Sequence, residues 1–223
     1  MVRHFDEELK HLREGLTAMA GQVEWMLELT LRALLERRDD LADRVNALDA
    51  GVDEQELKLD KTCIDLLALG APVARDLRLV ASALKIVPEL ERIGDHCCNI
   101  ARRAKLLNHQ PWILPGDAME RLGKETRDMV RQAVDAFVQG DASMARSVIA
   151  ADDLVDSLYM DIYRELLRLM LSDPLCIERA SHLILVAKNW ERIADQATNI
   201  AEEVLFILEG RNVKHPHLHQ ENL

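Results

Sequence analysis

The chain uses one eleven-residue motif twice, and this duplication restricts the folds open to it. Residues 91–101 read ERIGDHCCNIA and residues 191–201 read ERIADQATNIA, an offset of 100 positions. Each copy holds Glu, Asp and Asn at successive intervals of four. On a helix, residues four apart lie on one face, so each motif predicts a polar stripe along a helix.

The first stripe is predicted to interrupt an apolar face. Glu91 falls within the same narrow arc of the helical wheel as four apolar residues: Val80, Leu84, Val87 and Cys98. A carboxylate placed among buried residues is costly unless a cation, an arginine or water accompanies it. The motif therefore predicts a site where charge must be compensated.

Composition favours a helical protein that does not bind nucleic acid. The chain has 223 residues, with 48% hydrophobic and only 4% aromatic side chains, enough for one large core or two small ones. Its formal net charge of −11 argues against a surface that binds phosphate backbones.

Apolar periodicity predicts six helices, at about residues 5–38, 41–69, 73–107, 117–138, 141–171 and 174–209. The prolines and glycine of residues 109–116 mark a linker, because proline cannot continue a helix. We therefore expect an all-α protein of two tandem antiparallel three-helix bundles, residues 1–108 and 117–210, followed by a frayed tail at 211–223.

The second helix of each half carries acids too, at an offset of 103: Asp49 with Asp53, and Asp152 with Asp156. The halves are not chemically equal. Glu56 and Asp60 of the first half have Tyr159 and Tyr163 opposite them in the second.

Four carboxylates per half could thus converge between neighbouring helices. Oxygen ligands suit hard cations such as Mg²⁺, Mn²⁺, Ca²⁺ or ferric iron. The predicted metal ligands are Asp49, Asp53, Glu91, Asp95, Asp152, Asp156, Glu191 and Asp195. The alternative is that these acids form salt bridges with neighbouring arginines, namely Arg75, Arg78, Arg92 and Arg192.

No pattern in the chain favours catalysis. A ferritin-like di-iron centre needs two inward Glu-x-x-His pairs, and only Glu8 with His11 has that spacing. A carboxylate-bridged metalloenzyme and a metal-free helical scaffold remain as alternatives to a binding protein. The four cysteines, Cys63, Cys97, Cys98 and Cys176, are predicted to be buried thiols in a reducing compartment. No apolar run reaches 18 residues, which favours a cytoplasmic location.

Three segments resemble the PhoU family of phosphate-transport regulators: DLRLV at 76–80, LERIGD at 90–95 and ERIAD at 191–195. The resemblance covers nearly the whole chain, to about Gly210. It implies a non-enzymatic, cytoplasmic negative regulator of the phosphate-starvation response, linking a phosphate ABC transporter, through its ATPase subunit, to a sensor histidine kinase. It also implies a homodimer, and iron, zinc, manganese or magnesium at the eight acids named above.

Two positions depart from a symmetric repeat. The second half has Cys176, Ile177 and Glu178 in place of the Asp-Leu-Arg run, so a contact made by that run would be one-sided. Pro88 has Lys188 opposite it, which predicts two sites of different shape.

Overall fold

A computed structural model describes residues 2–69, 74–113 and 116–211. It contains six long helices and one 3-10 turn: α1 (Val2–Leu35), α2 (Asp39–Leu69), α3 (Ala74–Asn108), α4 (Gly116–Gln139), α5 (Ala142–Ser172), η1 (Pro174–Cys176) and α6 (Ile177–Glu209). Within these described ranges there is no β-strand. The predicted all-α class is confirmed.

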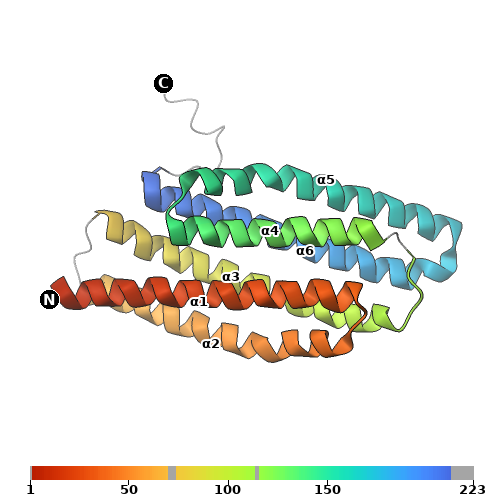
Figure 1. Ribbon diagram of the computed structural model, residues 1–223, viewed down its shortest axis with the longest axis horizontal. Helices are drawn as coiled ribbons and strands as arrows, with labels where there is room; N and C mark the ends of the chain where they lie inside the picture. Colours follow the sequence, from red (N-terminus) through yellow and green to blue (C-terminus); the bar gives the residue numbers. More distant parts are fainter. Residues whose placement is uncertain (1, 70–73, 114–115, 212–223) are drawn as a thin grey trace, which may run out of the picture.

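The helices form two antiparallel three-helix bundles, α1–α2–α3 and α4–α5–α6, packed side by side (Figure 1). In the first bundle α1 contacts both α2 and α3, and in the second α4 contacts both α5 and α6. The bundles meet where α3 packs along α6 and α1 packs along α4. The predicted tandem architecture is therefore present, and α3 continues as a helix through Pro88.

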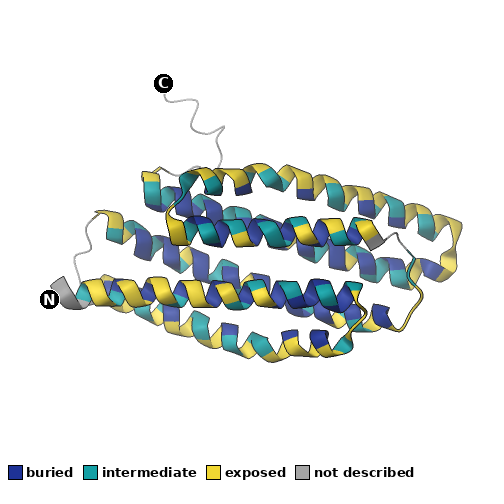
Figure 2. Cartoon of the chain, viewed as in Figure 1, coloured by how far each residue is buried: buried dark blue, intermediate teal, exposed yellow. Residues whose placement is uncertain are grey.

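One continuous core serves both bundles. The buried apolar side chains form a single cluster that includes residues of every helix (Figure 2). Trp190 of α6 is fully buried beside Gly123 of α4, where a Cβ would lie 3.1 Å from the Trp190 ring. The chain thus builds one large core, the first of the two possibilities that its length allows.

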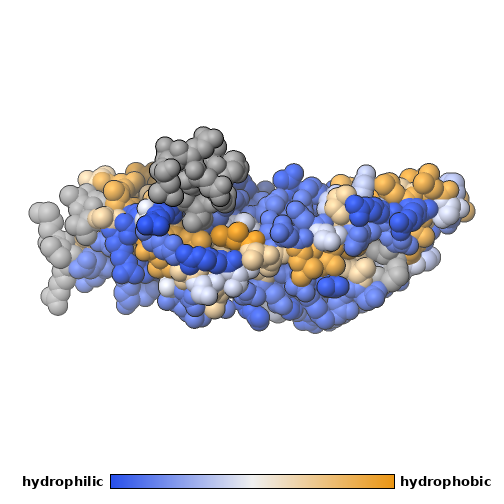
Figure 3. All heavy atoms as spheres, turned by 90° about the horizontal axis from the view of Figure 1, so that it is seen from above, coloured by the Kyte–Doolittle hydropathy of each residue, from blue (hydrophilic) through white to orange (hydrophobic). Residues whose placement is uncertain are grey.

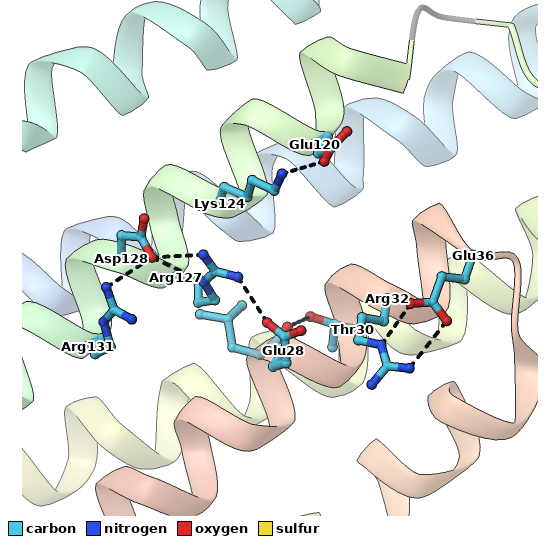
Figure 4. A network of polar contacts seen from close by, with 10 residues as sticks. Glu28, Thr30, Arg32, Glu36, Glu120, Lys124, Arg127, Asp128 and Arg131 are labelled. Atoms are coloured by element: carbon cyan, nitrogen blue, oxygen red, sulfur yellow. Dashed lines mark hydrogen bonds and ion pairs between the residues drawn. The ribbon is translucent and has the colours of Figure 1, made fainter.

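Ion pairs supplement the core where the bundles meet. Arg127 of α4 donates a hydrogen bond to Glu28 of α1 at 3.1 Å and another to its neighbour Asp128 (Figure 4). Between α3 and α6, the carboxylate of Glu203 on α6 accepts hydrogen bonds from Ser82 and Lys85 of α3. Glu203 is only 3% exposed, so this contact fixes α3 against α6 from within.

The ends of the helices follow their local sequence in the second bundle. Gly140 has a φ of 68° after α4, and the side chain of Asp141 accepts hydrogen bonds from the backbone N–H groups of Ser143 and Met144. This is the glycine stop and aspartate cap that such a pair favours. Asp173 likewise accepts from the backbone N–H of Leu175 before α6.

The first helix ends earlier than its periodicity predicts. It stops at Leu35, because Arg37 adopts a left-handed backbone with φ 57°. The Arg37 guanidinium donates to the carbonyl oxygens of Asn108 and Gln110, at the far end of α3. Residues 109–113 of the predicted linker are non-helical, and α4 begins at its last residue, Gly116.

The face shown in Figure 3 is largely hydrophilic, with apolar side chains gathered in places. One group lies where α5 turns into α6: Leu171 and Leu175 are each 87% exposed, and Ile177 is 47% exposed. No helix in the described ranges combines the length and the apolar character needed to cross a bilayer.

Candidate functional site

The first acidic cluster lies along the contact between α2 and α3. It consists of Asp49, Asp53, Glu56 and Asp60 on α2, and Glu91 and Asp95 on α3. The α2 acids flank the buried residues Val45, Val52 and Leu59, so packing of that apolar line places them at the edge of the core. Asp53 and Asp95 are exposed, while the other four are partly buried. The predicted stripe therefore runs along the rim of the core, with Glu91 partly buried and Asp95 exposed.

Burial and the crowding of like charges raise the pKa values of three of these acids, Asp49, Glu56 and Glu91. Burial, together with the carboxylates of Asp95, Glu56 and Asp53, raises the pKa of Glu91 to about 7, while Arg92 opposes the shift. The pKa of Glu56 is raised by burial and by Asp60. The Glu91 carboxylate therefore lies within electrostatic reach of Glu56 and Asp53 on α2.

Two thiols support the inner edge of this cluster. Burial raises the pKa of Asp49, and a hydrogen bond from the Cys98 thiol opposes that rise. Burial and the Asp49 carboxylate raise the pKa of Cys98 to about 12, and the pKa of fully buried Cys97 lies well above its ordinary value. All four cysteines are free and buried, as predicted, while the predicted reducing compartment stays a prediction.

The second acidic cluster lies at the equivalent contact, between α5 and α6. It consists of Asp152 and Asp156 on α5, and Glu191 and Asp195 on α6. Burial, together with the carboxylates of Asp195 and Asp156, raises the pKa of Asp152 to about 6, and the neighbouring Thr198 hydroxyl opposes the shift. Burial and Glu191 raise the pKa of Asp195, and Arg192 and Lys188 lower it.

A lysine is the main difference between the clusters. Lys188 Nζ lies 2.5 Å from Glu191 Oε1 and 5.1 Å from the centre of the Tyr159 ring. In the first cluster the equivalent positions hold Pro88 and Glu56. The second cluster therefore contains an ammonium group and an aromatic ring where the first has neither.

The salt-bridge alternative applies unequally to the two halves. Arg192 lies 3.5 Å from Asp195 and 3.9 Å from Glu191. Arg92, by contrast, pairs with Glu89 at 2.9 Å, outside the first cluster. Arg78 donates to the carbonyl oxygen of Ile207 and approaches Gly210, so it joins the ends of α3 and α6.

Sequence reasoning missed a polar seam between α3 and α6. His96 Nδ1 lies 2.8 Å from Asn189 Oδ1, and Asn199 donates a hydrogen bond to Glu89. Gln196, 8% exposed, lies beside His96. His96 and Gln196 occupy matching positions of the two repeats, and neither belongs to the core-facing stripe or to the acidic stripe. Polar residues of this kind could have indicated the seam.

The donor chemistry of the first cluster fits a hard cation, while its geometry is not that of a ready-made site. Six carboxylates lie together there, and the pKa values of Asp49, Glu56 and Glu91 are raised. Oxygen ligands of this kind suit Mg²⁺, Mn²⁺ or ferric iron. Among the residues that the structure describes, no three His, Cys, Asp or Glu side chains already converge as metal ligands.

The remaining candidates lie away from both clusters. Glu8 and His11 line a surface groove between α1 and α2 together with Lys58, and His11 is largely exposed, so they do not face a bundle interior. The predicted turn at residues 70–72 and the histidines at 215, 217 and 219 fall outside the described residues.

Fold and site together define a duplicated, acidic helical-bundle protein. The family model described as "PhoU domain" matches residues 16–104 and 119–204, once for each repeat. The chain belongs to the PhoU family.

Relatives of known name agree over almost the full length. The phosphate-specific transport system accessory protein PhoU homolog of Pseudomonas putida is 39% identical over 96% of this chain and 84% of its own. Its namesake in Aquifex aeolicus is 39% identical over 96% of this chain and 97% of its own.

Solved structures show the same fold. The crystal structure of PhoU from Pseudomonas aeruginosa has a TM-score of 0.90 at 38% identity, covering 93% of this chain and all of that one. The phosphate transport system regulatory protein PhoU from Streptococcus pneumoniae has a TM-score of 0.87 at 27% identity, covering 94% and 99%.

Proposed function

We propose that this chain is a cytoplasmic accessory protein of a phosphate-specific transport system and a negative regulator of the phosphate-starvation response. The observation that carries the proposal is the family match over both repeats, with relatives named as transport accessory proteins. In this proposal the protein links the ATPase subunit of the transporter to a sensor histidine kinase, reaches the membrane only through these partners and catalyses no reaction.

Charge and surface chemistry support a role in protein contacts. The net charge of −11 disfavours binding to duplex DNA, so regulation of transcription would pass through a partner. The long outer faces of α2 and α5 expose large apolar side chains, including Leu57, Ile64 and Leu167, which suit contact with another protein. A homodimer is part of the same proposal.

The acidic clusters are the proposed metal ligands within this function. The carboxylates of Asp49, Asp53, Glu91 and Asp95 would hold iron, zinc, manganese or magnesium, and the bound cation would neutralise repelling charges on two helices. This makes the metal a stabiliser of the bundle and not a catalyst.

Deletion and capture test the proposal. Cells lacking the protein are expected to express their phosphate-starvation genes in high phosphate, and re-expression of the wild-type chain should restore repression. Affinity purification from phosphate-replete cells should recover the transporter ATPase and the sensor kinase. A deletion strain that still represses the response in high phosphate would contradict the regulatory role.

A further inference from the structure

The outer surfaces of α2 and α5 carry exposed side chains of the same kinds in the same order. Each surface has an acid, an apolar residue, a base and a second apolar residue, spaced four, four and three positions apart, so the four lie along one stripe of the helix. On α2 they form the α2 face, Asp53, Leu57, Lys61 and Ile64, and on α5 they form the α5 face, Asp156, Met160, Arg164 and Leu167.

Folding alone does not require this agreement, because all eight side chains are exposed. The apolar ones are large and reach solvent to different degrees: Leu57 72%, Ile64 60%, Met160 39% and Leu167 38%. Exposed positions beside them differ in charge, since Lys58 has Asp161 as its repeat equivalent and Asp65 has Arg168. Exposed apolar residues that persist where neighbouring charges have reversed indicate a surface that contacts another molecule.

The two faces are related by an approximate two-fold axis. Where the bundles meet, each helix packs against its own repeat equivalent, α1 against α4 and α3 against α6. A surface that meets its own equivalent is generated by a two-fold rotation. In the parts that the structure describes, α2 and α5 pack only against helices of their own bundles and form the two outer edges of the molecule (Figure 1). Both faces are therefore available to a partner that shares this axis.

We propose that the α2 face and the α5 face each bind one subunit of the transporter ATPase, so that one chain bridges the two subunits of a symmetric dimer. This inference rests on the proposed function and assigns the contact surface within it. The relatives are named as accessory proteins of the transport system, which favours the ATPase over the kinase as this partner.

The chemistry of the two faces defines what each ATPase subunit must present. Aliphatic side chains would cover the two apolar residues, and a carboxylate would pair with the base between them, Lys61 or Arg164. A basic side chain would pair with the acid at the end of the stripe, Asp53 or Asp156. Arg164 now lies 3.4 Å from Asp161, and an exposed pair of this kind is weak, so a partner's carboxylate can replace it. A dimer of identical subunits presents the required patch twice.

Titration calorimetry with the purified ATPase subunit counts the contacts. The wild-type chain should bind two subunits. Leu57→Gln/Ile64→Gln, which changes only the α2 face, and Met160→Gln/Leu167→Gln, which changes only the α5 face, should each bind one subunit, and the two variants combined should bind none. Each single-face variant should also bind at least tenfold more weakly, because the second contact of the wild-type chain is intramolecular.

Two controls separate these faces from the rest of the surface. Leu175→Gln/Ile177→Gln removes two exposed apolar side chains at the turn between α5 and α6, and should change neither stoichiometry nor affinity. Lys61→Glu should reduce the stoichiometry to one, whereas Lys58→Glu reverses an exposed charge outside the α2 face and should leave it at two. Circular dichroism and urea unfolding establish that each variant is folded, which glutamine favours because it forms helix well.

The outcomes separate this contact from the proposed function. A single-face variant that still binds two subunits, or a wild-type chain that binds only one, would overturn the two-face contact and leave the proposed function standing. Self-association of the chain that Leu57→Gln/Ile64→Gln abolishes, with ATPase binding intact, would make a second copy of the chain the occupant and overturn the contact as well. A wild-type chain that binds no ATPase subunit would overturn both the contact and the transporter part of the proposed function.

Discussion

His96 and Gln196 occupy equivalent positions of the two repeats and lie against each other between α3 and α6, with their Nε2 atoms 3.5 Å apart. Two further contacts join the same helices. His96 of α3 lies against Asn189 of α6, and Asn199 of α6 donates a hydrogen bond to Glu89 of α3. A residue that meets its own repeat equivalent marks the axis relating the repeats. The two acidic clusters lie one on each side of it.

Loss of Lys85 is expected to destabilise the junction between the bundles. In Lys85→Met the carboxylate of Glu203, 3% exposed, loses its ammonium partner. Removing one partner of a buried charged hydrogen bond costs about 1–3 kcal/mol. Urea unfolding at pH 7 should show this loss, with Arg168→Met as control, because its exposed pair with Glu165 contributes under about 1 kcal/mol.

The coupling can be isolated with a second replacement. Glu203→Leu in the Lys85→Met background should recover part of the lost stability, because no buried carboxylate then remains. Strictly additive losses in this double-mutant cycle would mean that the pair carries no specific interaction.

Gly94→Ala is expected to stabilise the protein by about 0.5–1 kcal/mol, the cost of glycine within a helix. A Cβ at this position would meet Val52 at 3.5 Å, an ordinary contact, and the second repeat already has Ala194 there. Gly123→Ala is the contrast, since its Cβ would lie 2.6 Å from Leu31 and 3.1 Å from the buried ring of Trp190.

Overpacking of this kind destabilises by about 1–3 kcal/mol, so thermal unfolding should move the two variants in opposite directions. Equal shifts in melting temperature would show that helix propensity alone governs both positions.

Stability of the metal-free protein should fall as pH rises from about 4.5 to 7. The pKa of Glu91 is about 7 in the folded protein and 4.5 in its ordinary state, so between these values the folded chain binds more protons than the unfolded chain. Unfolding then becomes easier with rising pH. Asp152, with a pKa of about 6 against 3.8, acts in the same direction at lower pH.

Urea unfolding across this range, in the presence of a chelator, measures the slope. Glu91→Gln should flatten it between pH 5 and 7, because the titrating group is gone. A wild-type stability that climbs through this interval would contradict the raised pKa of Glu91.

Neutralising the first cluster should preserve or raise stability in the absence of metal. Glu91 and Asp95 are like charges four apart on α3, and such a pair costs about 0.2–0.5 kcal/mol. Glu91→Gln/Asp95→Asn should therefore melt at or above the wild-type temperature under chelation, and should no longer respond to added metal.

A loss of metal-free stability in that variant would point the other way. These acids would then be salt-bridge partners of neighbouring arginines, and the metal reading of the first cluster would be wrong.

Local patterns were sufficient for the helices. Period and repeat predicted α2 and α3, with Asp49 and Asp53 able to face Glu91 and Asp95, and in the structure both pairs of acids lie along the contact between α2 and α3. The Asp141 cap could be predicted from the sequence, because it depends only on residues two and three positions away.

Long-range contacts could not be predicted from such local patterns. The early end of α1 depends on Arg37 reaching carbonyl oxygens more than 70 positions later in the chain. The seam of His96 and Asn189 depends on which faces of α3 and α6 meet, and the repeat alone leaves that choice open. Lys188 was visible as a departure from symmetry, but its contact with Glu191 required the side-chain geometry.

The shared core has a consequence for how such a chain can change. Each bundle supplies the surface that a second subunit would supply in a symmetric dimer. Because the linker joins the two bundles, their association is intramolecular, at an effective concentration in about the millimolar range. In a true dimer every replacement appears twice, so a lysine added at one site is added at both. Fusion of the repeats lifts that constraint, and one half can keep an open anionic cluster while the other fills its own with a side chain.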